Sequence, residues 1–192
     1  MPAKATEIKP GMAVIYEGQL NIVLDTEHVK PGKGPAYVQT KMKNVKTGSI
    51  TTKRLNSSDR LDTANIDRRE MEFLYESSGK GEGPWVFMDL ETYEQLEIAG
   101  GDALPDSQRQ WLKPNLACIV EMYEGRPLGI QLPAAIELEV AETAPQPKGA
   151  TVTNQSKEAT LETGVVVRVP PFIENGQVIR VSPETGEYLG KA

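Results

Sequence analysis

The residue best suited to contacting a charged partner is Lys33, in the stretch 29–35. A glycine stands on each side of this lysine, and a proline follows one residue further out on each side. Because proline fixes φ and glycine supplies the dihedral angles of tight turns, the stretch predicts a hairpin tip. Lys33 is then a long cationic arm at the end of two strands. Taken alone, such a loop more often indicates a solubilising surface lysine.

Residues that carry enzyme chemistry are scarce. The chain has one histidine, His28, and one cysteine, Cys118, so a Cys–His nucleophile would require these two residues. Cys118 lies in an apolar run, where cysteine usually acts as a small core residue, and the two side chains cannot form a structural zinc site by themselves. The stretch around Lys33 also lacks the spacing and following helix of a phosphate-binding loop. The sequence therefore predicts a binding protein without metal or cofactor, not an enzyme.

Length and composition narrow the class of protein further. A chain of 192 residues is enough for one or two average domains or three small ones. No apolar run approaches the roughly 20 residues of a membrane span, and the first residues show no apolar signal region. One cysteine excludes an internal disulfide and fits a reducing cytosol. We expect a cytoplasmic globular protein that does not contact membranes.

Short strands separated by turns are expected throughout the first 65 residues. In the segment 36–43, Val38 and Met42 lie on one face, while Lys41 and Lys43 lie on the other, which makes a half-buried strand with a basic outer face. The polar stretch 56–65 has no periodicity and is interpreted as a boundary. With further strands expected at 12–17, 20–27 and 49–55, residues 1–65 predict a small SH3-like barrel.

The remaining residues predict two five-stranded OB-type barrels, at 66–129 and 130–192. A short helix or turn is expected at 91–97, a loop at 100–108 and a long polar loop at 144–156. Strands are expected at 70–76, 84–89, 116–124, 129–132, 136–142, 164–169, 177–181 and 187–189.

Charge is distributed unevenly between these three parts. Residues 1–65 hold 10 lysines and arginines against 6 carboxylates, whereas residues 66–129 hold 6 against 13 and residues 130–192 hold 5 against 8. A chain whose formal net charge is −6 is poorly suited to coating nucleic acid, because phosphate contacts need positive charge. We therefore expect a local RNA contact made by the first part. The acidic middle part is either a solvated spacer or a face toward a basic protein.

Two well-separated motifs carry a family resemblance. One runs from Val29 to Gly48 through the Pro-Gly-Lys-Gly tip, and a middle segment from Trp85 to Leu96 supports it. The other motif consists of Lys157, Ala159, Gly164, Val167, Val169, Pro170, Ile173 and Gly176, with Thr160, Thr163 and Tyr188 beside it. Both motifs resemble bacterial elongation factor P, and the resemblance covers essentially the whole chain.

The resemblance implies three small β-barrels in an L-shaped, tRNA-like arrangement, namely a KOW-like barrel followed by two OB folds. It implies a monomeric elongation factor that binds both ribosomal subunits between the peptidyl and exit tRNA sites and relieves stalling at consecutive prolines. Lys33 is then the residue that approaches the CCA end of the peptidyl-tRNA, and the loop 149–164 approaches the exit-site codon. The implied supporting residues are Lys30, Pro31, Gly32, Gly34 and Pro35 in the tip, Lys41, Lys43, Lys46 and Arg54 against RNA backbone, and Lys157, Thr160, Thr163, Gly164 and Tyr188 on the ribosome and mRNA side of the last domain.

Three questions stay open at this point. In many family members a modifying enzyme extends the tip lysine, whereas some members with a proline-flanked tip use the bare lysine, and here Pro35 follows Gly34. The chain also resembles the elongation factor P-like paralogue in architecture, although the Pro-Gly-Lys-Gly tip favours the factor itself. The remaining alternative is an RNA- or protein-binding OB/SH3 module with no ribosomal task.

Overall fold

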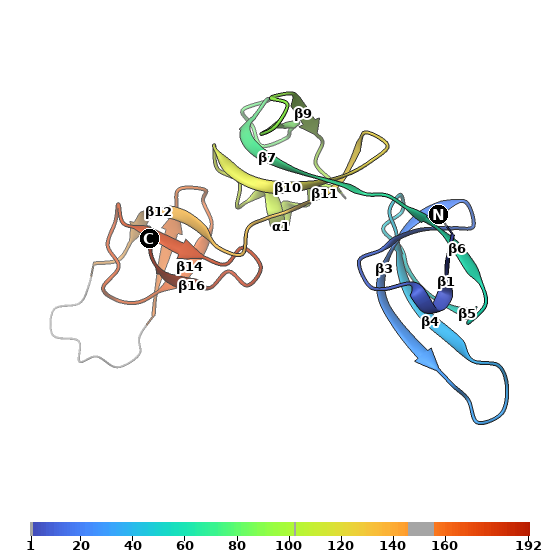
Figure 1. Cartoon of the computed structure of the whole chain (residues 1–192). Coiled ribbons are helices and arrows are strands. Elements are labelled where there is room, and N and C mark those ends of the chain that lie inside the picture. The colour runs from blue at the N-terminus through green and yellow to red at the C-terminus, as the bar shows by residue number, and fades with distance from the viewer. Residues whose placement is uncertain (1, 102, 146–155) are drawn as a thin grey trace. The chain divides into compact units, whose positions relative to one another are not determined.

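A computed structural model describes residues 2–101, 103–145 and 156–192. Strands dominate this part of the chain and form three sheets, which confirms the predicted all-β class (Figure 1). Contacts between residues group the chain into two compact units, Met1–Arg68 with Glu121–Leu128, and Arg69–Val120 with Gly129–Ala192. In the described ranges no helix has both the length and the apolar character needed to cross a membrane.

The first sheet has six strands in the order β1-β6-β2-β3-β4-β5. Its core is formed by inward-facing apolar side chains, of which Val23, Val38 and Met42 are at most 1% exposed. Around them pack Ala5, Ile8, Val14, Leu55 and Leu61. The elements are β1 (Pro2–Lys4), the 3₁₀ helix η1 (Ala5–Glu7), β2 (Ala13–Tyr16), β3 (Gln19–Val29), β4 (Tyr37–Asn44), β5 (Ile50–Asn56) and β6 (Arg60–Ala64).

The polar stretch 56–65, in which no strand was predicted, contains the strand β6, Arg60–Ala64. This strand pairs with β1 on one side and β2 on the other, so it lies inside the sheet. Only Leu61 of β6 is a buried apolar residue. Backbone pairing therefore maintains a strand here whose side chains show almost no hydrophobic alternation, which is why the sequence pattern missed it.

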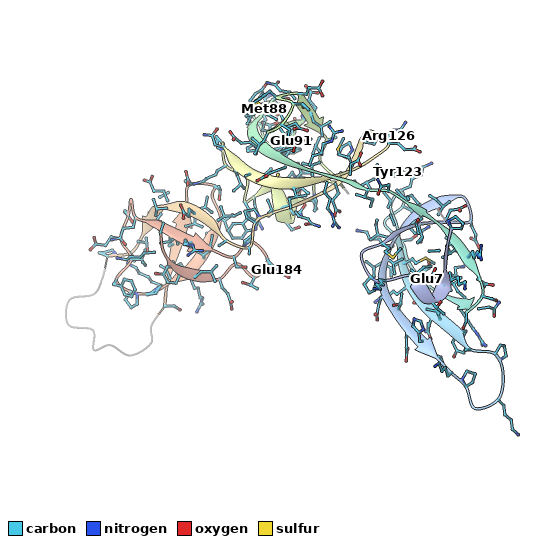
Figure 2. The ribbon with its side chains drawn as sticks, viewed as in Figure 1. Glu7, Met88, Glu91, Tyr123, Arg126 and Glu184 are labelled. Atoms are coloured by element: carbon cyan, nitrogen blue, oxygen red, sulfur yellow. The ribbon has the colours of Figure 1, made fainter. Side chains whose placement is uncertain are left out.

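Two of the hairpins close through a Glu-Gly turn. Glu17 and Gly18 have φ of 51° and 75°, and Glu124 and Gly125 have φ of 48° and 76°. Positive φ at both central positions is the mark of a type I′ turn, whose twist matches that of the flanking strands. In the second case β10 ends at Tyr123 and β11 begins at Arg126, on either side of the turn (Figure 2).

The second sheet has five strands in the order β11-β10-β7-β8-β9. Phe73 and Phe87 face each other in its interior with ring centroids 5.4 Å apart. The segment expected to be a short helix or turn instead begins with the turn at Glu91 (Figure 2) and continues as the strand β9, while a short helix occupies part of the expected loop. The elements are β7 (Asp67–Glu76), β8 (Trp85–Asp89), β9 (Gln95–Ile98), α1 (Asp106–Arg109), β10 (Leu116–Tyr123) and β11 (Arg126–Gln131).

The third sheet has five strands in the order β14-β13-β12-β15-β16. Its core contains Leu138, Val140, Ile173 and Ile179, all essentially buried, and Trp111 from the segment after α1 packs into the same core. The sequence missed β13, and most of the long loop expected before it, at 146–155, lies outside the described residues. The strands are β12 (Ile136–Thr143), β13 (Lys157–Leu161), β14 (Val166–Val169), β15 (Val178–Val181) and β16 (Tyr188–Lys191).

The carboxylate of Glu76 organises the loop between β7 and β8. It accepts hydrogen bonds from the backbone N–H groups of Ser78, Gly81 and Gly83 and from the Ser78 hydroxyl. These donors, led by the Ser78 hydroxyl, stabilise the charged form and lower the pKa of Glu76 to about 2. At neutral pH the loop is therefore closed around an ionised side chain.

We predict that this loop opens in acid. Because the pKa of Glu76 is lower in the folded than in the unfolded chain, its contribution is complete above about pH 4.5 and is lost as the pH falls toward 2. Amide chemical shifts should show Gly81 and Gly83 losing their hydrogen bonds in this window, while signals from the core around Phe87 persist. In Glu76→Leu, which removes both acceptor oxygens, the same amides should already be released at pH 7. Amide signals that stay constant between pH 5 and 2 would contradict this role of Glu76.

Candidate functional site

The candidate site is the hairpin of β3 and β4 with the loop that joins them, residues 30–36. Cross-strand pairs run from Asn21 opposite Asn44 out to Val29 opposite Tyr37, with one bulge between Val23 and Asp25. Figure 1 shows the two strands running side by side and ending in this loop. The strand β5 also pairs with β4 along the whole length, as far as Asn56 opposite Tyr37. Strand pairing on both sides of β4 therefore supports the hairpin up to its last paired residue, Tyr37.

The tip presents Lys33 to solvent. Lys33 and the neighbouring residues Lys30, Gly32, Gly34 and Pro35 are exposed, and Pro31 is half-buried. No described residue forms a hydrogen bond or ion pair with the Lys33 side chain. Lys33 is thus exposed at the end of the hairpin, and the contacts that it makes stay a prediction.

The two glycines beside Lys33 are not equivalent. Gly34 has a φ of +115°, which L-residues rarely adopt, whereas the φ of Gly32 lies outside this left-handed range. A Cβ atom at Gly32 would meet nothing within 4 Å, and one at Gly34 would only touch the Pro31 ring at 3.9 Å. The backbone conformation at Gly34, not crowding at the lysine stem, is thus the feature that requires glycine.

The outer face of β4 carries Lys41 and Lys43, both exposed as the alternation predicts. On β3, however, Asp25 lies opposite Lys41, and Glu27 lies opposite Gln39. The face is therefore acidic along β3 and basic along β4, and the edge strand β5 adds the cation of Arg54. This charge division was not visible in the sequence, because it depends on the register between strands.

Two further predicted RNA contacts flank this face. Lys46 is exposed in the turn after β4, where the side chain of Asn44 accepts hydrogen bonds from the N–H groups of Lys46 and Thr47 at 2.9 Å each. Arg54 on β5 is also exposed, and its guanidinium carbon lies 3.8 Å from the centroid of the Tyr37 ring. No sequence pattern indicates this cation–π pair, since its partners are 17 residues apart and meet only through strand pairing.

The candidates in the last third of the chain belong to the other compact unit. Lys157 is half-buried and donates to the carbonyl of Ala144, Thr160 lies on β13, and Gly164 forms the following turn with a φ of +86°. The Thr163 hydroxyl is buried without a hydrogen-bond partner among the described residues, and Tyr188 packs against the third core. Packing and turn formation account for Gly164 and Tyr188, so their contacts with a partner stay predictions.

Two arrangements that would suggest enzyme chemistry find little support. Burial raises the pKa of the Cys118 thiol to about 12, so this sulfur is a poor nucleophile, and His28 is exposed on β3. Among the described residues no cluster of three or more His, Cys, Asp or Glu side chains is arranged to hold a metal ion.

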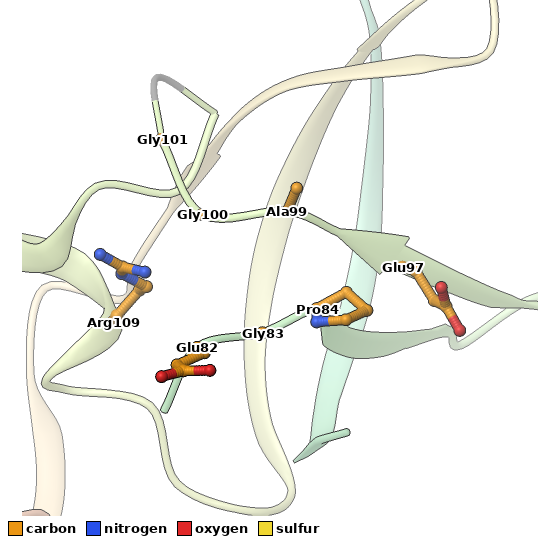
Figure 3. A pocket seen from close by; sticks show the side chains of 8 residues that line it. All are labelled: Glu82, Gly83, Pro84, Glu97, Ala99, Gly100, Gly101 and Arg109. Atoms are coloured by element: carbon orange, nitrogen blue, oxygen red, sulfur yellow. The ribbon is translucent and has the colours of Figure 1, made fainter. Parts of the chain in front are cut away.

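A shallow groove lies beside the loop that Glu76 organises (Figure 3). Its one cation, Arg109, is already engaged, because its guanidinium lies 4.5 Å from the Trp85 ring centroid and pairs with Asp106. The described lining contains no Ser, Thr, Cys, His or Lys side chain. The lining residues are Glu82, Gly83, Pro84, Glu97, Ala99, Gly100, Gly101 and Arg109.

Comparison with solved structures supports the multi-barrel class of this fold. A structure described as eukaryotic translation initiation factor 5A from Methanococcus jannaschii matches with a TM-score of 0.52, covering 69% of this chain and 94% of that chain at 23% sequence identity. At this identity the likeness concerns the fold alone. The chain is thus an all-β protein with small barrels of the KOW-like and OB type.

Sequence comparison identifies the family. Profiles described as "Elongation factor P (EF-P) KOW-like domain", "Elongation factor P (EF-P) OB domain" and "Elongation factor P, C-terminal" match residues 4–61, 66–130 and 136–191. Elongation factor P of Gemmatimonas aurantiaca is 44% identical over 192 residues, covering 100% of this chain and 99% of that protein. Elongation factor P of Alkaliphilus metalliredigens is 42% identical over 187 residues, covering 97% and 98%. The chain belongs to the elongation factor P family of translation factors.

We predict that the two tip glycines respond differently to substitution. Gly34→Ala forces an L-residue toward a left-handed conformation that costs about 1–2 kcal/mol, so the loop should rearrange. Gly32→Ala, the matched control, should leave the loop unchanged because its Cβ meets open space. Backbone amide chemical shifts of residues 30–36 measure both effects. Equal perturbation by the two substitutions would show that the tip has another conformation.

Proposed function

We propose that this factor binds the ribosome between the peptidyl and exit tRNA sites and promotes peptide-bond formation at consecutive prolines. The observation that carries the proposal is the exposed Lys33, without a partner among the described residues, at the end of a hairpin supported on both sides of β4. In this role Lys33 lies along the CCA end of the peptidyl-tRNA. Family membership supports a ribosome-associated task but is coarser than this assignment.

The physical task of the factor is positioning. Proline is a poor reactant in peptide-bond formation, because its ring restricts the chain and its amine is secondary. The ribosome already supplies the catalytic centre, so a helper need only restore geometry, and correct orientation can contribute up to about 7–11 kcal/mol to a reaction barrier. A cationic arm can order the terminal nucleotides of a tRNA by contacting their phosphates.

The basic side chains of β4 and β5 serve as the RNA-contacting surface in this proposal. Lys41, Lys43, Lys46 and Arg54 are all exposed on or beside the outer face. Asp25 and Glu27 lie on β3, and their negative charge repels phosphate. The RNA backbone is therefore expected along the β5 side of the hairpin. This arrangement leaves Lys33 beyond the last rung as the group that reaches furthest.

The remaining expectations form part of the same proposal. We assign three domains, 1–65, 66–129 and 130–192, to a monomeric cytoplasmic factor that contacts both ribosomal subunits. The proposed contacts of the last domain toward the ribosome and mRNA side are Lys157, Thr160, Thr163, Gly164 and Tyr188. Because Lys33 is exposed, a lysine-modifying enzyme of the source organism can reach its side chain.

We predict that Lys33→Ala abolishes the rescue of proline-run translation with little change in stability. An exposed, unpartnered side chain contributes little to packing, so the free energy of unfolding should change by no more than about 0.5 kcal/mol. The measurement is in vitro translation of a reporter with three consecutive prolines, next to a proline-free reporter. Rescue by Lys33→Ala at the wild-type level would refute the proposed role of Lys33.

The companion variant Lys33→Arg separates a bare lysine from an extended one. Arginine keeps the charge but changes hydration and shape and prevents acylation of the amine. Partial activity is expected if Lys33 acts unmodified, and activity as low as that of Lys33→Ala is expected if it acts only when extended. The factor must be purified from its own source, and its intact mass then reports the modification.

We also predict that ribosome binding depends on salt through Lys41 and Lys43. The double variant Lys41→Gln/Lys43→Gln should weaken binding and reduce the slope of log affinity against log salt concentration by about 1.4–1.8, the value for two phosphate contacts. The control Lys4→Gln/Lys9→Gln removes the same charge from exposed positions away from the face. Identical slopes in the two double variants would contradict phosphate contacts by β4.

A further inference from the structure

We propose that Tyr37 is a positioning residue that holds the guanidinium of Arg54 ready to bind an RNA phosphate next to the hairpin tip. The inference rests on the proposed function and adds to it a residue to which sequence reasoning assigned no role. It concerns the edge of the first sheet, where β5 pairs with β4 on one side only.

The first step is the geometry of the pair. Tyr37 is the first residue of β4 after the tip loop and lies opposite Asn56, while Arg54 lies opposite Gln39, two residues further along. Tyr37 and Arg54 are therefore diagonal neighbours on the same outer face. A separation of 3.8 Å between the guanidinium carbon and the ring centroid corresponds to direct contact with the ring face.

The second step is that Arg54 has no carboxylate partner among the described residues. Three other arginines among these residues do form ion pairs with carboxylates, namely Arg68, Arg69 and Arg109. Arg54 instead contacts an aromatic ring and is exposed, so the N–H groups at the edge of its guanidinium remain available. A guanidinium with free edges is suited to bidentate binding of phosphate oxygens.

The third step is what the tyrosine adds. An arginine side chain loses much rotamer freedom when it docks, and a guanidinium already held against a ring loses less. Lys41 and Lys43, on the same face, have no such aromatic partner among the described residues. Among the described residues, Arg54 is thus the cation of this face whose orientation is set before RNA binds, and it lies next to the strand pair from which the Lys33 loop extends.

The experiment is a double-mutant cycle on ribosome affinity. Tyr37→Leu should lower the affinity about two- to fivefold, the range expected for loss of an exposed cation–π contact, while Tyr37→Phe keeps the ring and should bind as the wild type does. In the Arg54→Gln background, Tyr37→Leu should have no further effect. Arg54→Gln itself should reduce the salt slope by about 0.7–0.9, the value for one phosphate contact.

A merely structural role of Tyr37 would produce a different pattern. Tyr37→Leu would then weaken binding equally in the Arg54 and Arg54→Gln backgrounds, and that result would overturn the proposal. An unchanged affinity of Tyr37→Leu or Arg54→Gln would also overturn it. If Tyr37→Leu lowers the melting temperature, the cycle is repeated with Tyr37→Thr, whose β-branched side chain suits a strand, and the same pattern of coupling is expected.

Two controls separate this proposal from the proposed function. Failure of the wild-type chain to bind ribosomes would overturn the function itself, whereas normal binding with no coupling between Tyr37 and Arg54 would overturn only the positioning role. A photoreactive residue at Thr52, exposed on the neighbouring rung of the same face, should cross-link to RNA. Cross-linking only to a ribosomal protein would overturn the assignment of phosphate as the partner.

Discussion

The register of β4 between β3 and β5 is the constraint on which the rest of the site depends. With this register Val38 and Met42 point into the core while Lys41 and Lys43 point outward. A slip of one residue would turn every side chain to the opposite face, burying two lysines and exposing the two apolar residues. The burial of Val38 and Met42 thus fixes which charges the hairpin presents.

This constraint separates stability from function along one strand. The buried face of β4 holds the sheet together, and the exposed face is free to carry binding groups because few folding contacts depend on it. From Val38, the buried residue of β4 nearest the tip, the chain reaches Lys33 in five residues, a distance of at most roughly 18 Å. The paired strands therefore hold Lys33 away from the body of the sheet, and no buried side chains are needed in the tip loop itself.

The sequence predicted the parts of this arrangement that depend on local pattern. The alternation in 36–43 predicted the faces of β4, and the Pro-Gly-Lys-Gly-Pro stretch predicted the exposed tip. It did not predict β6, whose pairing depends on backbone groups, nor the burial of Trp111 in the third core. The Tyr37–Arg54 contact was equally beyond reach, because residues distant in sequence become neighbours only once the register is known.

The central claim is that Lys33 meets the 3′ end of the peptidyl-tRNA, and site-directed cross-linking tests it most directly. A photoreactive amino acid at position 33 would be compared with one at position 46, in the turn at the opposite end of β4. On ribosomes stalled within a proline run, we predict that position 33 cross-links to the terminal nucleotides of the peptidyl-tRNA and that position 46 does not. Cross-links from position 33 to other RNA or protein only, with the factor bound, would contradict the account.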